Sequence, residues 1–194
     1  FRRVLFRSTM ECWIYRQGSG HFEFFGKNYR NYQLAIDGSQ RVYFYKGYGT
    51  IGSNSYQAWS TNQTINANQW YHIALTWEGN SLKLYVNGNF VWSANDAVSS
   101  PIPDFHLYAF EFGRRAGENA YYMNGRLAEA RLWNIARTQD EIKNSMYSSL
   151  IGVESGLIGY WPLQSDFKDY SQYGLTGTPV GEVNLQSSGI LPFT

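Results

Sequence analysis

Acidic side chains on strands are candidate catalytic residues, because glycoside hydrolysis uses two carboxylates placed over one sugar ring. Alternate residues of a strand face the same way, so such a pair would stand two positions apart. Glu129 is followed at that distance by Arg131, Glu111 by Gly113, and Glu23 has no acid beside it. We therefore expect no enzyme activity, and a glycoside hydrolase is the least favoured alternative. Glu129 and Arg131 predict a cross-strand ion pair, or alternatively a polar spot on a binding face.

Cysteine and histidine give no stronger signal for catalysis or metal binding. Cys12 is the single cysteine, so an intramolecular disulfide is impossible. Its neighbours alternate as in a strand, which favours a small buried residue. His21, His72 and His106 lack the spacing of a metal site. No nucleophile elbow of the form G-x-S-x-G supports a catalytic serine.

Aromatic residues are abundant, with 16 tyrosines and 7 tryptophans. Aromatic rings favour strands, and when exposed they also favour binding surfaces, where they could stack on sugar rings. Several fall in or beside expected loops, close to asparagines whose amides could bind hydroxyl groups. The predicted glycan-binding rim comprises Tyr48, Trp59, Trp92, Tyr108, Tyr121 and Tyr122, with Asn95 and Asn119. The alternative for each residue is a structural role in strand packing.

The elements that must position these residues are centred on residues 70–88, WYHIALTWEGNSLKLYVNG. Apolar residues alternate there with a period of two, which indicates strands. Tight turns are predicted at residues 78–81 and at Asn87-Gly88. Three consecutive antiparallel strands follow, the third over residues 90–95. Their broad apolar face requires a second sheet as a cover.

Further strands are predicted on both sides of this meander, and one helix follows them. The helix begins at a capping box in which Thr138 caps and Glu141 stands three positions on, and it runs to about Ser149. The fold class is therefore all-β, a two-sheet antiparallel sandwich with one short C-terminal helix. The other predicted strands are residues 9–16, 22–26, 32–37, 41–46, 56–64, 108–113 and 123–133.

The segment 70–88 resembles the central hairpin of LamG-like domains in the concanavalin A-like lectin/glucanase superfamily, W-x-H-[IV]-A-x-T-x-x-G-x-x-L-x-L-Y-V-N-G. Residues 112–137 are similar to the same family's G-x-[IL]-x-E-x-R-[LIV]-W-N-x-A-R segment. The resemblance covers most of residues 9–146 and implies a jelly roll. It also implies that His72 packs within the sheet.

The two ends of the chain differ in character from the predicted central domain. Residues 1–8, FRRVLFRS, look like a translated sequencing adapter, so we expect a bacterial metagenomic fragment whose signal peptide is not observable. Residues 156–181 resemble a second signature that accompanies LamG-like modules. Residues 9–186 are the expected domain, in which 156–186 are a C-terminal extension or the start of a second copy. Residues 187–194 are an expected frayed tail.

The resemblance also implies a possible Ca²⁺ site, because calcium takes several oxygen ligands gathered by loops. Asp169 lies in the family's D-x-S-x-x-G turn and is the first candidate ligand. Glu118 and Asn119 occupy the loop in which the related pentraxins place calcium ligands. The alternative is that each acid caps a turn.

Composition limits the function classes. The net charge is +1 and the basic residues are scattered, which argues against nucleic acid as a partner. No apolar run approaches the length of a membrane span. The sequence therefore predicts a non-catalytic, lectin-like carbohydrate-binding module of a larger extracellular or cell-surface protein. The alternative is a protein–protein adhesion or spacer module, and the partner is accordingly a glycan or a cell-surface protein.

Overall fold

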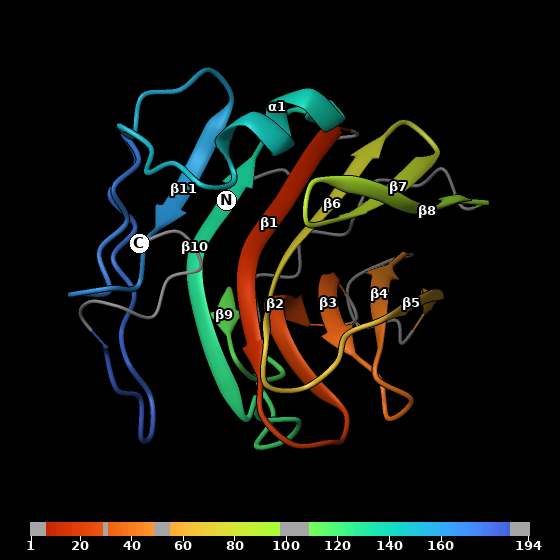
Figure 1. Cartoon of the computed structure of the whole chain (residues 1–194), viewed down its shortest axis with the longest axis horizontal. Helices are drawn as coiled ribbons and strands as arrows, with labels where there is room; N and C mark the ends of the chain where they lie inside the picture. Colours follow the sequence, from red (N-terminus) through yellow and green to blue (C-terminus); the bar gives the residue numbers. More distant parts are fainter. Residues whose placement is uncertain (1–6, 29–30, 49–54, 98–108, 187–194) are drawn as a thin grey trace.

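A computed structural model describes residues 7–28, 31–48, 55–97 and 109–186 of the chain. Two antiparallel sheets pack face to face as a jelly-roll sandwich (Figure 1). The six-stranded sheet has the order β11-β10-β1-β6-β7-β8. Its strands are β1 (Arg7–Arg16), β6 (Trp70–Glu78), β7 (Ser81–Val86), β8 (Asn89–Asn95), β10 (Gly125–Trp133) and β11 (Leu157–Trp161).

The five-stranded sheet has the order β5-β4-β3-β2-β9. Every pairing in it is antiparallel. Its strands are β2 (Phe22–Asn28), β3 (Tyr32–Ile36), β4 (Arg41–Gly47), β5 (Tyr56–Thr64) and β9 (Glu111–Phe112).

The predicted meander is confirmed as β6, β7 and β8. In the first hairpin Leu75 lies opposite Leu84, and in the second Leu84 lies opposite Trp92. Asn87 and Gly88 both have positive φ, at 50° and 73°, as the tight turn between β7 and β8 requires. The apolar inner face of the meander packs against the five-stranded sheet, whose inner side chains include Leu34, Val42 and Phe44. Burying these facing surfaces is the main force that holds the sandwich together.

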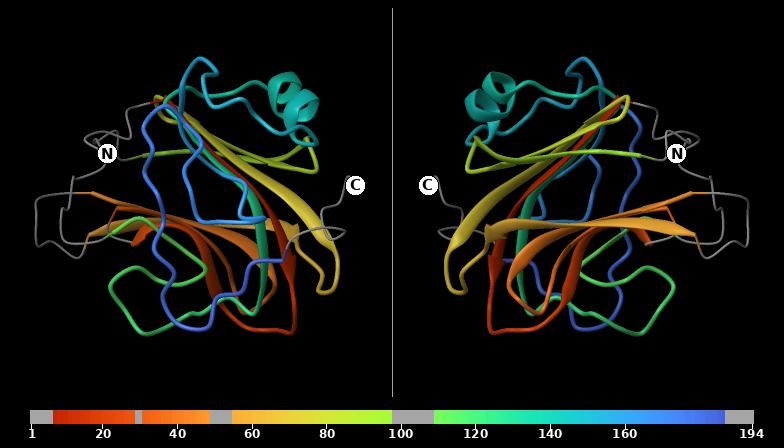
Figure 2. Two further views of the ribbon diagram at one scale, coloured as in Figure 1. Left: turned by 90° about the vertical axis from the view of Figure 1, so that its left-hand side faces the viewer. Right: turned by 90° about the vertical axis from the view of Figure 1, so that its right-hand side faces the viewer.

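Helix α1 (Gln139–Ser145) covers the outer face of the six-stranded sheet (Figure 2). The capping box is present, because Thr138 accepts from the backbone N–H of Glu141 while Glu141 accepts from Thr138. Ile142 of the helix packs with Ala74 and Tyr85 of the sheet. The helix ends at Ser145, four residues before the predicted end at Ser149, and Met146 then turns inward onto the sheet.

Several boundaries differ from the sequence prediction, most of them by one or two residues. Strand β1 begins at Arg7 instead of Thr9, and Ser8 is buried opposite Trp77. Within the described part of the strand predicted over residues 108–113, only β9 is formed, and the strand predicted over 123–133 begins at Gly125. Residues 156–186 contribute β11, which pairs with β10 within the same sheet.

Candidate functional site

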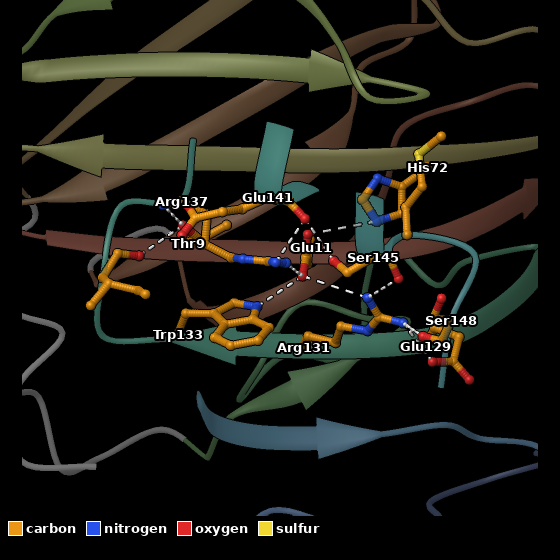
Figure 3. Close-up of polar contacts among 12 residues, drawn as sticks. Thr9, Glu11, His72, Glu129, Arg131, Trp133, Arg137, Glu141, Ser145 and Ser148 are labelled. Carbon is orange, nitrogen blue, oxygen red and sulfur yellow. Dashed lines mark hydrogen bonds and ion pairs between the residues drawn. The ribbon is translucent and has the colours of Figure 1, made fainter. Parts of the chain in front are cut away.

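The family-like motif residues form a buried polar network between the six-stranded sheet and α1 (Figure 3). Glu11 accepts hydrogen bonds from Trp133 Nε1 at 2.8 Å and from Arg137 Nη1 at 2.7 Å. Arg137 also donates to the carbonyl of Glu141 at 2.8 Å, in the first turn of the helix. The carboxylate of Glu11 therefore links β1 to β10 and to the start of α1.

Arg131 fastens the other end of the helix. Its guanidinium contacts the carboxylate of Glu129 at 2.9 Å, and both side chains are fully buried. It also donates to the carbonyls of Ser145 at 3.0 Å and Ser148 at 2.6 Å. The predicted ion pair between Glu129 and Arg131 is thus present, but it forms within β10 and does not cross between strands. The alternative, a polar spot on a binding face, is wrong because α1 and the segment after it close this face.

His72 lies beside this network and is packed in the sheet, as the resemblance implied. Its Nε2 stands 3.8 Å from the carboxylate of Glu11, and the ring is almost completely enclosed. Burial lowers the pKa of His72 to about 4; Glu11 opposes this shift, and Arg131 and Arg137 reinforce it. The imidazole is therefore neutral near pH 7. Cys12 is fully buried as well, in agreement with its predicted packing role.

The outer face of the five-stranded sheet is different, because no helix covers it in the part of the chain that the structure describes (Figure 2). In β4, Val42 and Phe44 point into the core, so Tyr43 and Tyr45 point outward. The rings of Tyr43 and Tyr45 are 4.7 Å apart, and those of Tyr45 and Tyr56 are 5.8 Å apart. Three tyrosines from two adjacent strands thus form a continuous aromatic surface.

Arg115 extends this surface toward β2. Its guanidinium lies 4.0 Å from the ring centroid of Tyr121 and 6.0 Å from that of Tyr45. The buried carboxylate of Glu23 holds it at 2.6 Å. The backbone of Tyr121 accepts a hydrogen bond from the N–H of Glu23 at 3.0 Å, which places the loop 113–124 along this edge of the sheet.

We call this surface the tyrosine face, defined by Tyr43, Tyr45, Tyr56, Arg115 and Tyr121. Tyr56 and Tyr121 are 45% and 39% exposed, so ring surface is available to a ligand. Burial raises the pKa of Tyr45 to about 12, and its hydroxyl therefore stays protonated at neutral pH.

Two buried oxygens under the tyrosine face have no hydrogen-bond partner among the described residues. They are Oε2 of Glu23 and Oε1 of Gln33. Gln33 lies opposite Tyr45 in the register of β3 and β4, and its side chain is on the same side of the sheet. Buried polar atoms normally find a partner, so these two acceptors call for a donor from water or a ligand.

The residues predicted for the glycan rim separate into distinct places. Tyr121, Tyr122 and Asn119 share the loop 113–124, and the hydroxyl of Tyr122 donates to Asn119 at 3.3 Å. Trp92 and Asn95 lie instead on β8 of the other sheet, where Trp92 packs against the core. Tyr48 follows β4, and its N–H donates to the carbonyl of Ser55.

The last two residues predicted for the glycan rim are Trp59 and Tyr108. The prediction that Trp59 is an exposed rim residue is wrong, because its ring is 9% exposed and stacks on Phe44 in the core. It takes the inward position of a strand whose outward positions are Ala58 and Ser60. Tyr108 lies outside the described residues.

Sequence reasoning missed Tyr43, Tyr45, Tyr56 and Arg115. The signal was present in RVYFYKG of β4, where two tyrosines alternate with Val42 and Phe44. That pattern places both tyrosines on the face opposite the core. It gives no hint that Arg115, 70 positions beyond Tyr45, would lie beside them.

The predicted calcium ligands are not gathered into one site. The carboxylate of Asp169 accepts from the N–H groups of Tyr160, Ser171 and Leu175, and from the Ser171 hydroxyl, all within 2.9 Å. This arrangement matches the turn-capping alternative. Glu118 pairs with Arg115 at 3.6 Å in a different loop. Within the described ranges, no group of three or more His, Cys, Asp or Glu residues could hold a metal ion. Each carboxylate oxygen of Asp169 already accepts two hydrogen bonds from the protein.

Solved structures of several other proteins have a similar jelly-roll fold. A candidate carbohydrate-binding protein from Bacteroides ovatus superposes with a TM-score of 0.70 at 21% identity, over 87% of this chain and 50% of that one. The CBM40 module of a Ruminococcus gnavus sialidase, bound to α2,3-sialyllactose, gives 0.57 at 14% identity, over 72% and 82% of the two chains. Domain 4 of an extracellular arabinanase from Geobacillus stearothermophilus, in complex with arabinotriose, gives 0.55 at 16% identity, over 72% and 66%. At these identities the likeness is one of fold.

Curated relatives match a smaller part of the chain. Human pappalysin-1 is 35% identical over 92 residues, and mouse pappalysin-1 is 33% identical over 81 residues. The match covers 43% of this chain and 6% of the human protein. Residues 7–143, well over half of the chain, match the family described as the concanavalin A-like lectin/glucanases superfamily. Together with the two-sheet jelly roll, this match assigns the chain to the concanavalin A-like lectin/glucanase superfamily.

Proposed function

We propose that the chain is a non-catalytic, lectin-like carbohydrate-binding module whose glycan site is the tyrosine face. The observation that carries this proposal is the row of partly exposed rings from Tyr56 through Tyr45 to Tyr121, bridged by Arg115. A sugar ring can stack on such rings while its hydroxyl groups bond to neighbouring polar atoms. Sugar-binding proteins with the same fold support the proposal.

A non-catalytic role is favoured because two buried glutamates are paired with an arginine and do not reach the surface. Glu11 and Glu129 both contact Arg131 and have no exposed side-chain surface. A hydrolase needs a protonated acid and a base or nucleophile that both reach the substrate. These two carboxylates serve the attachment of α1 instead.

The tyrosine face would bind weakly by itself. A shallow site with a few stacked rings gives about −4 to −6 kcal/mol, or millimolar to tens of micromolar affinity. Repeated modules in one larger protein would raise this through avidity. We therefore propose that the chain works beside neighbouring domains of an extracellular or cell-surface protein. The curated relatives are much longer than the matched segment, which supports this context. Among the described residues, no helix has the length and apolar character to span a membrane.

A glycan array with the full chain tests the proposal. Tyr56→Ala and Tyr45→Ala should each lower the affinity for the best ligand about tenfold, a loss of about 1.4 kcal/mol. Tyr173→Ala is the matched control, because Tyr173 is 54% exposed and lies in the C-terminal segment. Equal binding by all three folded variants would refute the tyrosine face as the site.

The same array should be run with Ca²⁺ and with a chelator. Binding that disappears with the chelator would support the untested prediction of a calcium requirement. Because Asp169 is held by backbone donors, we expect binding to persist.

A second candidate function is protein–protein adhesion or spacing. It is favoured by exposed apolar side chains in the region after α1, where Ile151 is 81% and Val153 is 68% exposed. Tyr170 follows nearby, since its carbonyl lies against Gly152. No glycan binding by the folded chain would favour this candidate.

A further inference from the structure

We propose that the tyrosine face selects neutral glycans that present hydroxyl groups and discriminates against glycans that carry a carboxylate. This inference rests on the proposed function and names the ligand class of the same site. It is not what the sialyllactose complex of a structural relative would suggest. It follows from how charge is arranged on the tyrosine face of this chain.

Arg115 is the cation at the centre of the face, but its charge is already matched. Glu23 contacts the guanidinium at 2.6 Å and Glu118 contacts it at 3.6 Å. Burial would lower the pKa of Arg115, yet the hydrogen bond and attraction to Glu23 raise it above the ordinary value. The arginine is therefore charged and paired, which makes it a rigid floor between Tyr45 and Tyr121.

The neighbouring arginines are paired in the same way. Arg41 begins the strand that carries Tyr43 and Tyr45, and it contacts Asp37 at 3.1 Å. Arg114 precedes Arg115 and is paired with Glu111. Arg41, Arg114 and Arg115, the described arginines around the tyrosines, thus each have a carboxylate of the protein as partner.

An acidic sugar would have to displace Glu23 from Arg115. The Glu23 side chain has no exposed surface, so the displaced carboxylate would stay buried without its counter-charge. Separating the two partners of a buried ion pair is strongly unfavourable, because one charge stays buried without its counter-charge. If Glu23 kept its place, the ligand carboxylate would approach a second carboxylate across the same guanidinium, and this repulsion also disfavours binding.

The acceptors that lack partners favour the opposite ligand chemistry. Oε2 of Glu23 and Oε1 of Gln33 are buried acceptors without a donor among the described residues. Both atoms are enclosed, so a sugar hydroxyl group would reach them only through a bridging water. A carboxylate on the same water would bring a second negative charge toward Glu23. Charge repulsion and the paired state of Arg115 therefore favour a neutral, hydroxyl-bearing ligand.

Matched probes that differ only at the carboxyl group test the inference on the full chain. One pair is methyl-esterified and de-esterified polygalacturonan, and a second is the methyl ester of 3′-sialyllactose and free 3′-sialyllactose. We expect the neutral member to bind at least about tenfold tighter, which equals about 1.4 kcal/mol. Equal or tighter binding of the acidic member would overturn the inference and leave the proposed function standing. Failure of the whole array to show any glycan binding would reject both.

Glu23→Gln tests the mechanism, because it removes the counter-charge of Arg115 and keeps the side-chain size. We expect this variant to gain binding to the acidic probes in a salt-sensitive manner and to lose discrimination. Glu118 is a more exposed partner of Arg115, so Glu118→Gln is less disruptive to folding than Glu23→Gln. This second variant should reduce the discrimination between neutral and acidic probes by a smaller factor. Glu78→Gln is the matched control, since Glu78 pairs with Arg7 on the other sheet. Discrimination unchanged in both test variants would contradict the role assigned to Arg115 and its partners.

Discussion

Replacing Arg131 by methionine should strongly destabilise the domain while leaving the tyrosine face intact. Methionine retains much of the aliphatic volume but removes the guanidinium. The substitution deletes the contact with Glu129 at 2.9 Å and the hydrogen bonds to the carbonyls of Ser145 and Ser148 at 3.0 and 2.6 Å. The carboxylate of Glu129 would then stay buried without its cation.

The magnitude follows from this burial. Breaking a buried ion pair by removing one partner costs about 3–5 kcal/mol. Both side chains have no exposed surface, so solvent does not screen the loss. Domains of this kind are stable by about 5–15 kcal/mol, so the loss would be a large fraction of the total stability. The segment after α1 should loosen first, because Arg131 is what holds the carbonyls at its start.

Urea unfolding followed by tryptophan fluorescence measures the effect as a change in midpoint at constant slope. Arg7→Met is the matched control, because the Arg7 and Glu78 side chains are 70% and 58% exposed; that change should cost less than about 1 kcal/mol. The double variant Glu129→Gln/Arg131→Met should recover at least about 1 kcal/mol of the single loss, as expected for coupled neighbours. A loss for Arg131→Met no larger than for Arg7→Met would refute the reasoning.

Two further predictions concern pH and the core. Burial lowers the pKa of His72 to about 4, whereas the pKa of an unfolded histidine is about 6.5. As the pH falls, the unfolded state therefore binds the proton first. The free energy of unfolding keeps its full value only above about pH 6.5. The free energy of unfolding should fall by up to about 3 kcal/mol as the pH drops from 6.5 toward 4. Urea unfolding midpoints of the native chain and of His72→Gln at pH 7 and pH 5 measure this loss. An equal loss between pH 7 and pH 5 in both proteins would contradict the role of His72. Trp59→Ala should cost about 3–5 kcal/mol of stability because the ring stacks in the core. Thermal unfolding measures that loss, and a stable variant that only lost glycan binding would return Trp59 to the rim.

Local patterns predicted most of the sandwich. Alternation and two tight turns specify β6, β7 and β8, since a hairpin's register follows from its turn and from which face is apolar. The capping box at Thr138 likewise marks the start of α1 from four consecutive residues. The end of α1 was predicted less well, because Met146 leaves the helix to pack on Trp13, a residue more than a hundred positions away.

The candidate site was predicted only in part, and Asp169 and Trp59 illustrate why. The sequence placed both in plausible binding positions. In the structure the oxygens of Asp169 accept hydrogen bonds from backbone N–H groups, and the indole of Trp59 packs against Phe44. Which side chain is covered depends on partners far away in the chain, and these do not appear in a local pattern.

The sequence by itself determined the alternating strands, the tight turns, the helix cap and the family-like motifs, because each depends on residues close together in the chain. Tertiary structure alone decided which face is open. Arg131 and Arg137 hold α1 over one sheet, while the loop 113–124 brings Arg115 and Tyr121 beside Tyr45 on the other. Burial and charge pairing are properties of these long-range neighbours, and for this reason the tyrosine face emerges only once the two sheets are packed together.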